Sequence, residues 1–248
     1  MTTGTDAGGE DPYFASVAEG YDRTQPVMAG PAYAAGLSFV LDLIPYEADV
    51  PFTCVELGCG TATLLAGVLE RYPKAAGVGL DTEVGMLQVA ARKLAPFGER
   101  AQLHAADVAT CDLPACDLLL SSFMFHHVPP ERLEGLLRRI AQALRPGGHF
   151  LLLDQMRAGP DWSEGIGVLN RRRYQRHVAG ALAAGTITQE EIDARWAFKR
   201  QMKADGKDVE HRHRAEEILE AMSGAGFAEA GLVWRQFAAT LLVGWVSP

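Results

Sequence analysis

Apolar positions along the chain recur with two different spacings, and the spacing predicts which segments are strands and which are helices. Short apolar runs predict strands over residues 52–58, 75–81, 101–107, 116–123 and 149–155. Longer stretches with apolar residues on one face predict helices over 61–73, 83–98, 129–148 and 214–227. Strands and helices that alternate at this spacing form right-handed crossovers. We therefore expect a parallel sheet with helices on both faces.

The two ends of the chain depart from this alternation. Two β-rich runs within 230–247 have almost no residues between them, so they can only be antiparallel neighbours. Residues 12–45 and 157–212 have helical patterns without a strand signal. Ligands of such sheets bind beyond the carboxyl ends of the strands, and we expect both helical segments to act as lids there.

Composition is that of an ordinary globular protein, but the charge is unevenly distributed. The 248 residues are 48% hydrophobic and 22% charged, which suits one large domain. The net charge is −8, yet residues 157–214 carry 12 Lys and Arg against 8 Asp and Glu. The acidic remainder argues against broad nucleic-acid binding, because such binding depends on neutralising phosphates.

No pattern in the sequence indicates a membrane, a secretory route or a metal. No apolar run approaches the roughly 18 residues of a membrane helix, and no signal-peptide pattern is present, so we expect a cytoplasmic protein. The cysteines, Cys54, Cys59, Cys111 and Cys116, lack the C-x₂-C spacing of a zinc site. We therefore expect neither a disulfide framework nor a bound metal.

The stretch VELGCGTAT, residues 55–63, joins the first predicted strand to a glycine-rich turn. Gly58 and Gly60 allow the backbone to turn tightly and approach a ligand, and Thr61 is the expected cap of the next helix. Such a loop alone suits a phosphate. However, Glu56 would repel a phosphate, and Thr63 stands where the dinucleotide fingerprint has glycine or alanine.

Two further acids end the neighbouring predicted strands. Asp81 comes about 20 residues after the loop, where an acid can accept hydrogen bonds from ribose hydroxyls. Asp107 ends the third strand and could accept from an exocyclic amine. Together with Glu56 they describe a cationic nucleoside, although each acid alone could simply cap a turn.

At these residues the chain resembles the class I S-adenosylmethionine-dependent methyltransferases. VELGCGTA (55–62) is similar to the family's glycine motif, GVGLDTEVGML (77–87) to its ribose motif and AADV (105–108) to its adenine motif. CDLLLSSFMFHHV (116–128) and LRPGGHFLLLD (144–154) are similar to the later motifs. The resemblance covers roughly residues 50–155 and departs at Ala62, where the family usually has glycine. It implies a seven-stranded sheet whose last strand is antiparallel.

The resemblance implies that S-adenosyl-L-methionine is the cofactor, with S-adenosyl-L-homocysteine as product. Glu56 would orient its ammonium group, Asp81 would hold the ribose and Met86 would pack on the adenine. The whole implied cofactor set is Tyr21, Glu56, Gly58, Cys59, Gly60, Asp81, Thr82, Met86, Asp107, Val108 and Ser122. Met86 would serve equally well as a core methionine.

The predicted segments then form one α/β domain over residues 1–248, with a Rossmann-like, mostly parallel sheet. Its expected parts are a flexible N-terminus (1–11), a helical lid (12–45), the cofactor-binding core (50–155), a helical insertion for the acceptor (157–212), and a final helix with an antiparallel hairpin (213–248).

Histidines that follow the fourth strand are the candidate general bases. His126 and His127 stand at the rim of the expected site, and the ordinary pKa of histidine suits proton removal near neutrality. The alternative is that they cap the next helix or bond locally. His211 and His213 are second candidates.

The basic insertion is the candidate acceptor region. Its arginines could pair with a carboxylate or phosphate of the acceptor, or lie on solvated surface. Aromatic residues could line an acceptor pocket or pack in the core. The arginines are Arg171, Arg172, Arg173 and Arg176, and the aromatics are Trp162, Tyr174, Trp196 and Phe198.

These observations favour a methyltransferase acting on an oxygen, nitrogen or carbon of a small molecule, including acidic acceptors and secondary metabolites. One alternative is a cyclase-like enzyme that binds the same cofactor without transferring its methyl group. Others are a nucleic-acid methyltransferase that uses the 171–176 arginines, a non-catalytic binding module and a nicotinamide oxidoreductase. The oligomeric state stays open, a homodimer included.

Overall fold

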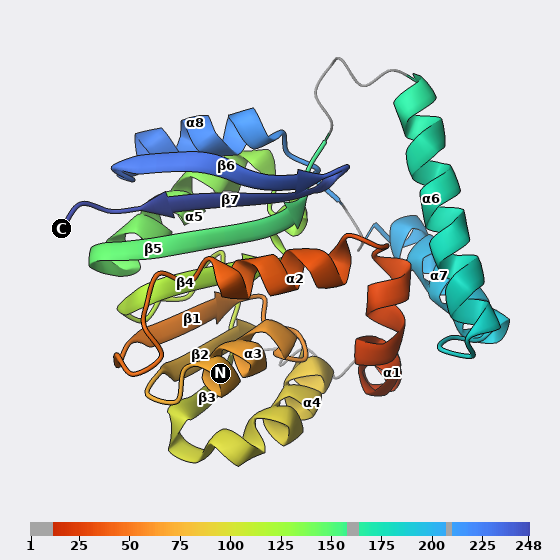
Figure 1. Cartoon of the computed structure of the whole chain (residues 1–248), viewed down its shortest axis with the longest axis horizontal. Coiled ribbons are helices and arrows are strands. Elements are labelled where there is room, and N and C mark those ends of the chain that lie inside the picture. Colours follow the sequence, from red (N-terminus) through yellow and green to blue (C-terminus); the bar gives the residue numbers. More distant parts are fainter. Residues whose placement is uncertain (1–11, 158–163, 207–209) are drawn as a thin grey trace, which may run out of the picture.

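Within the described residues, strands form one seven-stranded sheet in the order β3-β2-β1-β4-β5-β7-β6 (Figure 1). The computed structural model describes residues 12–157, 164–206 and 210–248. The strands are β1 (Thr53–Leu57), β2 (Ala76–Asp81), β3 (Ala101–Ala105), β4 (Cys116–Ser122), β5 (Leu144–Gln155), β6 (Glu229–Gln236) and β7 (Ala239–Trp245). Strand β7 lies antiparallel between β5 and β6, and β1 to β5 are parallel. The predicted fold class is thereby confirmed.

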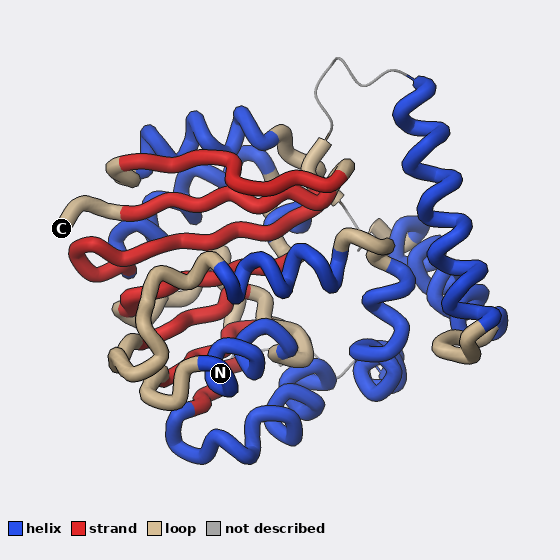
Figure 2. Tube along the Cα trace, in the orientation of Figure 1, coloured by secondary structure: helices blue, strands red, loops and turns tan. Residues whose placement is uncertain are grey.

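Helices cover both faces of this sheet (Figures 1 and 2). They are α1 (Pro12–Met28), α2 (Tyr33–Asp42), α3 (Thr63–Arg71), α4 (Val84–Leu94), α5 (Pro130–Ala143), α6 (Glu164–Ala183), α7 (Gln189–Ala204) and α8 (Ala215–Ala225), with short 3₁₀ helices η1 (Ala95–Arg100) and η2 (Phe125–His127). In the part of the chain described, no helix is both long and apolar enough to cross a membrane.

Alternating side chains of the buried strands form a separate core on each face. Leu118 and Leu120 of β4 pack with α2, α3 and α4. Leu119, between them, packs on the opposite face with α5 and α8. Successive strand side chains point to opposite faces, so a continuous apolar run is what a sheet covered on both sides requires.

Helices α1, α6 and α7 stand beyond the carboxyl ends of the parallel strands (Figure 1). A small cluster joins them, in which Val27 of α1 packs with Ile187 and Ile192. The Arg23 guanidinium of α1 pairs with the Glu191 carboxylate of α7. Both helical segments outside the alternating core therefore meet at the edge of the sheet where ligands bind.

Two local expectations are corrected by the structure. Thr61 does not cap α3: the cap position is Ala62, whose φ of 57° is left-handed, while the Thr61 hydroxyl donates to Asp22 on α1 at 2.5 Å. The third strand ends at Ala105, so Asp107 lies in the turn beyond it. Its carboxylate accepts from the Ala109 N–H at 2.8 Å, and this local bond favours a turn over an extended strand.

Candidate active site

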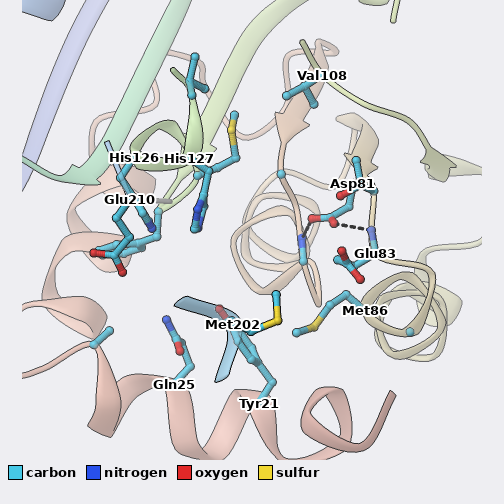
Figure 3. Close-up of a pocket in the computed structure, with 18 of the residues that line it drawn as sticks. Tyr21, Gln25, Asp81, Glu83, Met86, Val108, His126, His127, Met202 and Glu210 are labelled. Carbon is cyan, nitrogen blue, oxygen red and sulfur yellow. Dashed lines mark hydrogen bonds between the residues drawn. The ribbon is translucent and has the colours of Figure 1, made fainter. Parts of the chain in front are cut away.

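A cavity of about 940 Å³ lies between the sheet edge and helices α1 and α7 (Figure 3). The loops after β1, β2, β3 and β4 each contribute to its wall. Tyr21 and Gln25 line it from α1, and Trp196 and Lys199 line it from α7. Parallel strands end at one edge of a sheet, so residues far apart in sequence converge here.

The glycine loop after β1 forms part of the wall, and its two glycines are required for different reasons. Gly58 has a φ of +63°, and a Cβ there would stand 2.4 Å from Cγ of Met124. Gly60 has a φ of +54°, but a Cβ there would meet no atom within 4 Å. Gly58 is therefore needed for packing, whereas Gly60 leaves open space that a ligand can enter.

Asp81 holds two loops together at the cavity wall. One carboxylate oxygen accepts from the Gly60 N–H at 2.7 Å, and the other accepts from the Glu83 N–H at 2.9 Å. Burial raises the pKa of Asp81, and these hydrogen bonds oppose that change. Thr82 and Met86 line the cavity beside it. The ribose-binding candidate thus also fixes the shape of the glycine loop.

The loop after β3 supplies the next part of the wall. Asp107 and Val108 both line the cavity. The Asp107 carboxylate accepts from the Ala109 N–H and, at 3.3 Å, from the Thr110 hydroxyl. An ionised carboxylate has about four acceptor positions, so Asp107 retains capacity for a ligand amine.

Three residues of the predicted cofactor set lie behind the wall instead of in it. Glu56 is 1% exposed, and its carboxyl accepts from the Leu65 N–H at 3.1 Å and the Ser122 hydroxyl at 3.3 Å. Burial raises the pKa of Glu56 to about 8. Cys59 is buried against Gly79 and belongs to the core of the α3 face. Glu56, Cys59 and Ser122 therefore support the loop from beneath.

Tyr21 closes the cavity from α1, opposite the sheet (Figure 3). The Arg195 guanidinium of α7 lies 5.1 Å from the centre of its ring, and Arg195 also donates to the Gln25 side chain at 2.7 Å. Burial raises the pKa of the Tyr21 phenol, and Arg195 opposes that rise. Arg195 thus connects helices α1 and α7 at the cavity.

His126 forms a pair with Asp154 at the end of β5. The His126 Nδ1 lies 2.6 Å from one Asp154 oxygen, and the His126 backbone N–H donates to the other at 3.0 Å. Burial alone would lower the pKa of His126, but the charge and hydrogen bond of Asp154, together with the charge of Glu210, raise it. His127 lines the same cavity, with its ring centre 4.1 Å from that of His126.

The cavity has two chemically distinct sides. In Figure 3, His126, His127 and Glu210 lie on one side, and Asp81 and Met86 lie on the other. The second side carries the glycine loop and the predicted nucleoside-binding acids. The first side carries groups able to accept or stabilise a proton.

Sequence reasoning missed Asp154, Lys199 and Glu210. Asp154 is 1% exposed and lies one residue before the end of β5, so the rule that selected Asp81 and Asp107 could also have found it. Glu210 pairs with Lys199 at 3.1 Å and with Arg212 at 2.8 Å. Burial alone would raise the pKa of Glu210, but the two cations lower it to about 2. No sequence signal distinguishes Lys199 or Glu210 from other charged residues of the insertion.

The remaining predicted acceptor residues lie in different environments. Trp196 and Phe198 line the cavity, but Tyr174 and the 171–176 arginines do not. Arg171, Arg172 and Arg176 are exposed on α6. Trp162 lies outside the described residues, as does the predicted flexible segment 1–11.

The two second-rank histidines both contact the turn that carries His126. His213 is buried, with Nε2 2.9 Å from the Val128 carbonyl oxygen. The His211 N–H donates to the His126 carbonyl at 2.6 Å. These contacts hold the 210–213 segment beside His126.

The central part of the chain matches a known family. Residues 54–148 match the family described as "Methyltransferase domain". The chain is 25% identical over 126 residues to the carboxy-S-adenosyl-L-methionine synthase of Campylobacter lari, covering 51% of this chain and 54% of that protein. It is 38% identical over 99 residues to the trans-aconitate 2-methyltransferase of Methylobacterium nodulans, covering 40% of this chain and 36% of that protein. The chain thus spans about half, or less, of the length of these relatives.

A solved structure extends the likeness to the whole fold. Human N-acetylserotonin methyltransferase in complex with S-adenosylmethionine superposes with a TM-score of 0.60. The match covers 96% of this chain and 60% of that one, at 16% identity. Likeness at this identity shows the shared fold alone.

Proposed function

We propose that this chain, which belongs to the class I S-adenosylmethionine-dependent methyltransferases, methylates an oxygen, nitrogen or carbon nucleophile of a small molecule. The observation that carries the proposal is the two-sided cavity. The glycine loop, Asp81 and Met86 form one side, and the His126–Asp154 pair stands on the other. Cofactor and acceptor can thus meet in one cavity.

The residues on the glycine-loop side of the cavity suit S-adenosylmethionine. When bound, this cofactor supplies a methyl group on a positively charged sulfur, and S-adenosylhomocysteine remains after transfer. Gly60 leaves open space for a ligand at the loop, and Asp81 and Asp107 present carboxylates to ribose hydroxyls and an amine. Glu56 supplies a buried carboxyl behind the loop, and a ligand ammonium nearby would favour its ionised form. S-adenosylmethionine has no phosphate, so its binding requires no phosphate-binding group.

His126 is the proposed general base. Its Nδ1 contacts Asp154, which favours the tautomer with the proton on Nδ1 and an unprotonated Nε2. An unprotonated Nε2 can remove a proton from a hydroxyl or amine nucleophile as the new bond forms. Asp154 then stabilises the imidazolium and holds the ring in place.

Anionic small molecules are among the proposed acceptors, because cationic side chains line the cavity. Lys199 and Arg195 line the cavity from α7. The named activity of the Methylobacterium relative concerns trans-aconitate, which is a carboxylic acid. A nucleic-acid acceptor has less support, because Arg171, Arg172 and Arg176 project from α6 without lining the cavity.

The test is direct detection of both products. The protein is incubated with methyl-labelled S-adenosylmethionine and a panel of phenols, amines and carboxylic acids that includes trans-aconitate. Mass spectrometry follows S-adenosylhomocysteine and the labelled acceptor. His126→Ala should reduce turnover of a hydroxyl or amine acceptor by about 10²–10⁴-fold, whereas His104→Ala, an exposed histidine on β3, should not. Equal rates in the two variants would show that His126 is not the general base, and the proposal of methyl transfer would still stand.

A second candidate function comes from the relatives. Several of them are named carboxy-S-adenosyl-L-methionine synthases, at 25–33% identity over part of the chain. Such an activity would use the same cofactor site without methylating an acceptor. In the same assay with a small-metabolite extract, a cofactor species heavier by the mass of CO₂, because a carboxyl group has replaced one hydrogen, would favour the synthase when no labelled acceptor is found.

A further inference from the structure

A second hollow of about 1100 Å³ lies beside the cavity, and we call it the basic groove. Trp196, Lys199 and Glu210 line both spaces and form the wall between them. The other side chains that define the groove here are Arg157, Arg200, Lys203, His211 and Arg212. The groove is thus adjacent to the side of the cavity that carries His126.

The charges of the basic groove are not balanced. Glu210 pairs with Lys199 at 3.1 Å and with Arg212 at 2.8 Å, and Arg157 makes a weaker pair, at 3.6 Å, with Glu217 at its edge. Across the described residues, neither Arg200 nor Lys203 has a side-chain hydrogen bond or an ion pair. In a chain of net charge −8, this groove is a local concentration of positive charge.

Helix α7 presents these groups as one stripe. Trp196, Arg200 and Lys203 occupy positions i, i+4 and i+7, which fall on one helical face. Trp196 remains 42% exposed, although an indole of this size is usually well buried. Like charges one turn apart on a helix repel each other, and among the described residues no carboxylate pairs with Arg200 or Lys203. A bound anion would remove that repulsion.

We propose that the basic groove binds an anionic group, a carboxylate or a phosphate, of a small-molecule acceptor. This inference rests on the proposed function and specifies the class of its substrate. Arg200 and Lys203 would hold the anion, and the indole of Trp196 would pack against the part of the acceptor that connects the groove to the cavity. The acceptor's nucleophile would then reach the side where His126 stands.

The experiment uses anions of known chemistry and keeps cofactor binding separate. Citrate represents carboxylates and pyrophosphate represents phosphates. Each is titrated by calorimetry into the full chain saturated with S-adenosylhomocysteine. We expect at least one of them to bind, and the double variant Arg200→Glu with Lys203→Glu to weaken that binding at least tenfold. The preferred anion indicates whether the acceptor carries a carboxylate or a phosphate.

A matched control separates the groove from overall charge. Arg171→Glu with Arg172→Glu makes the same change in net charge on exposed positions of α6, outside both hollows. Anion affinity should stay within twofold in this variant, and Trp196→Phe should remove any anion-dependent change in tryptophan fluorescence. S-adenosylhomocysteine affinity should be unchanged in every variant.

Three results would overturn the proposal. The first is that neither anion binds. The second is that both double variants weaken anion binding equally. The third is that a short single-stranded RNA binds more tightly than both anions and that Arg200→Glu with Lys203→Glu abolishes this RNA binding. Failure of the proposed function looks different: S-adenosylhomocysteine would not bind the wild-type chain, whereas anion binding to the protein without it would still be measurable.

Discussion

The His126 imidazole and the Asp154 carboxylate form a two-point contact across the ends of neighbouring strands. Nδ1 of the ring lies 2.6 Å from one carboxylate oxygen, and the backbone N–H of the same histidine donates to the other at 3.0 Å. The carboxylate therefore fixes both the ring and the chain that carries it. Because Asp154 is 1% exposed, water screens this interaction little.

The first prediction concerns the pH dependence of turnover. Asp154 raises the pKa of His126, and the base form of histidine exists above its pKa. In Asp154→Asn the pKa of His126 should fall, so the limb of the rate profile that rises with pH should move to lower pH. The maximal rate should also drop by roughly 10²–10⁴-fold, because the ring loses its orientation.

A second substitution tests the same prediction in case the Asp154→Asn variant does not fold. Glu210 also raises the pKa of His126 but does not bond to its ring. Glu210→Gln should move the limb in the same direction by a smaller amount, with S-adenosylhomocysteine affinity unchanged. A limb that stays in place in both variants would show that His126 is not the titrating base.

The second prediction concerns stability and Glu56. Burial raises the pKa of this carboxyl to about 8, so between about pH 4.5 and pH 8 the folded state holds a proton that the unfolded chain has released. The stability linked to this proton is fully present below the unfolded pKa of Glu56, about 4.5, and is lost as pH rises through its folded pKa, about 8. The free energy of unfolding should therefore fall with pH in this window relative to Glu56→Gln, by at most ~1.4 kcal/mol per unit.

Urea denaturation of both proteins at several pH values measures the difference. Parallel curves would contradict the raised pKa of Glu56. A second readout tests its link to the ligand. S-adenosylhomocysteine carries an ammonium group, which should lower the pKa of Glu56 on binding. Calorimetry at pH 7 in buffers of different ionisation enthalpy should detect proton release by the wild type and much less by Glu56→Gln.

The third prediction compares two glycines of one loop. Gly58→Ala should cost roughly 2–4 kcal/mol of stability, because left-handed strain adds to a collision with Met124. Gly60→Ala should cost only about 1–2 kcal/mol, since its methyl group enters open space. Affinity for S-adenosylhomocysteine should nevertheless fall sharply in Gly60→Ala. Unchanged affinity in that folded variant would show that the ligand does not occupy the space beside Gly60.

The fourth prediction concerns the attachment of α1 to the glycine loop. Asp22 accepts from the Thr61 hydroxyl at 2.5 Å and pairs with Lys93 at 2.6 Å. Asp22→Ala should weaken S-adenosylhomocysteine binding by about 3–10-fold, the scale of one or two hydrogen bonds. Glu19→Ala, which removes an exposed ion pair with Arg92 one turn earlier, should have little effect. Equal effects would mean that α1 is held by general packing and that the Asp22 contact is not specific.

Much of the fold follows from the order of apolar runs. The alternation over residues 50–155 predicts the parallel part of the sheet, and the short connection near Phe237 predicts the antiparallel hairpin; both are confirmed. The order of apolar runs did not predict that β7 lies between β5 and β6. A hairpin's sequence fixes how its two strands pair, but the edge on which it docks depends on packing against the rest of the sheet.

The cofactor side of the site is visible in the sequence because its residues have local signals. Glycines that need positive φ, such as Gly58, and an acid that ends a strand, such as Asp81, are defined by their own short segments. Their roles toward the ligand stay predictions. The sequence could not show that Glu56 lies behind the cavity wall, because burial depends on what packs over a residue.

By itself, then, the sequence determined the alternating core, its hairpin and the glycine loop with its acids, because periodicity and turn chemistry act within a few residues. Only the tertiary structure decided that Asp154 supports His126 and that α7 turns Trp196, Arg200 and Lys203 toward a groove beside the cavity. Contacts of this kind join segments separated by tens of residues. They arise when crossovers bring the strand ends and helices α1 and α7 to one edge of the sheet, and no local pattern specifies them.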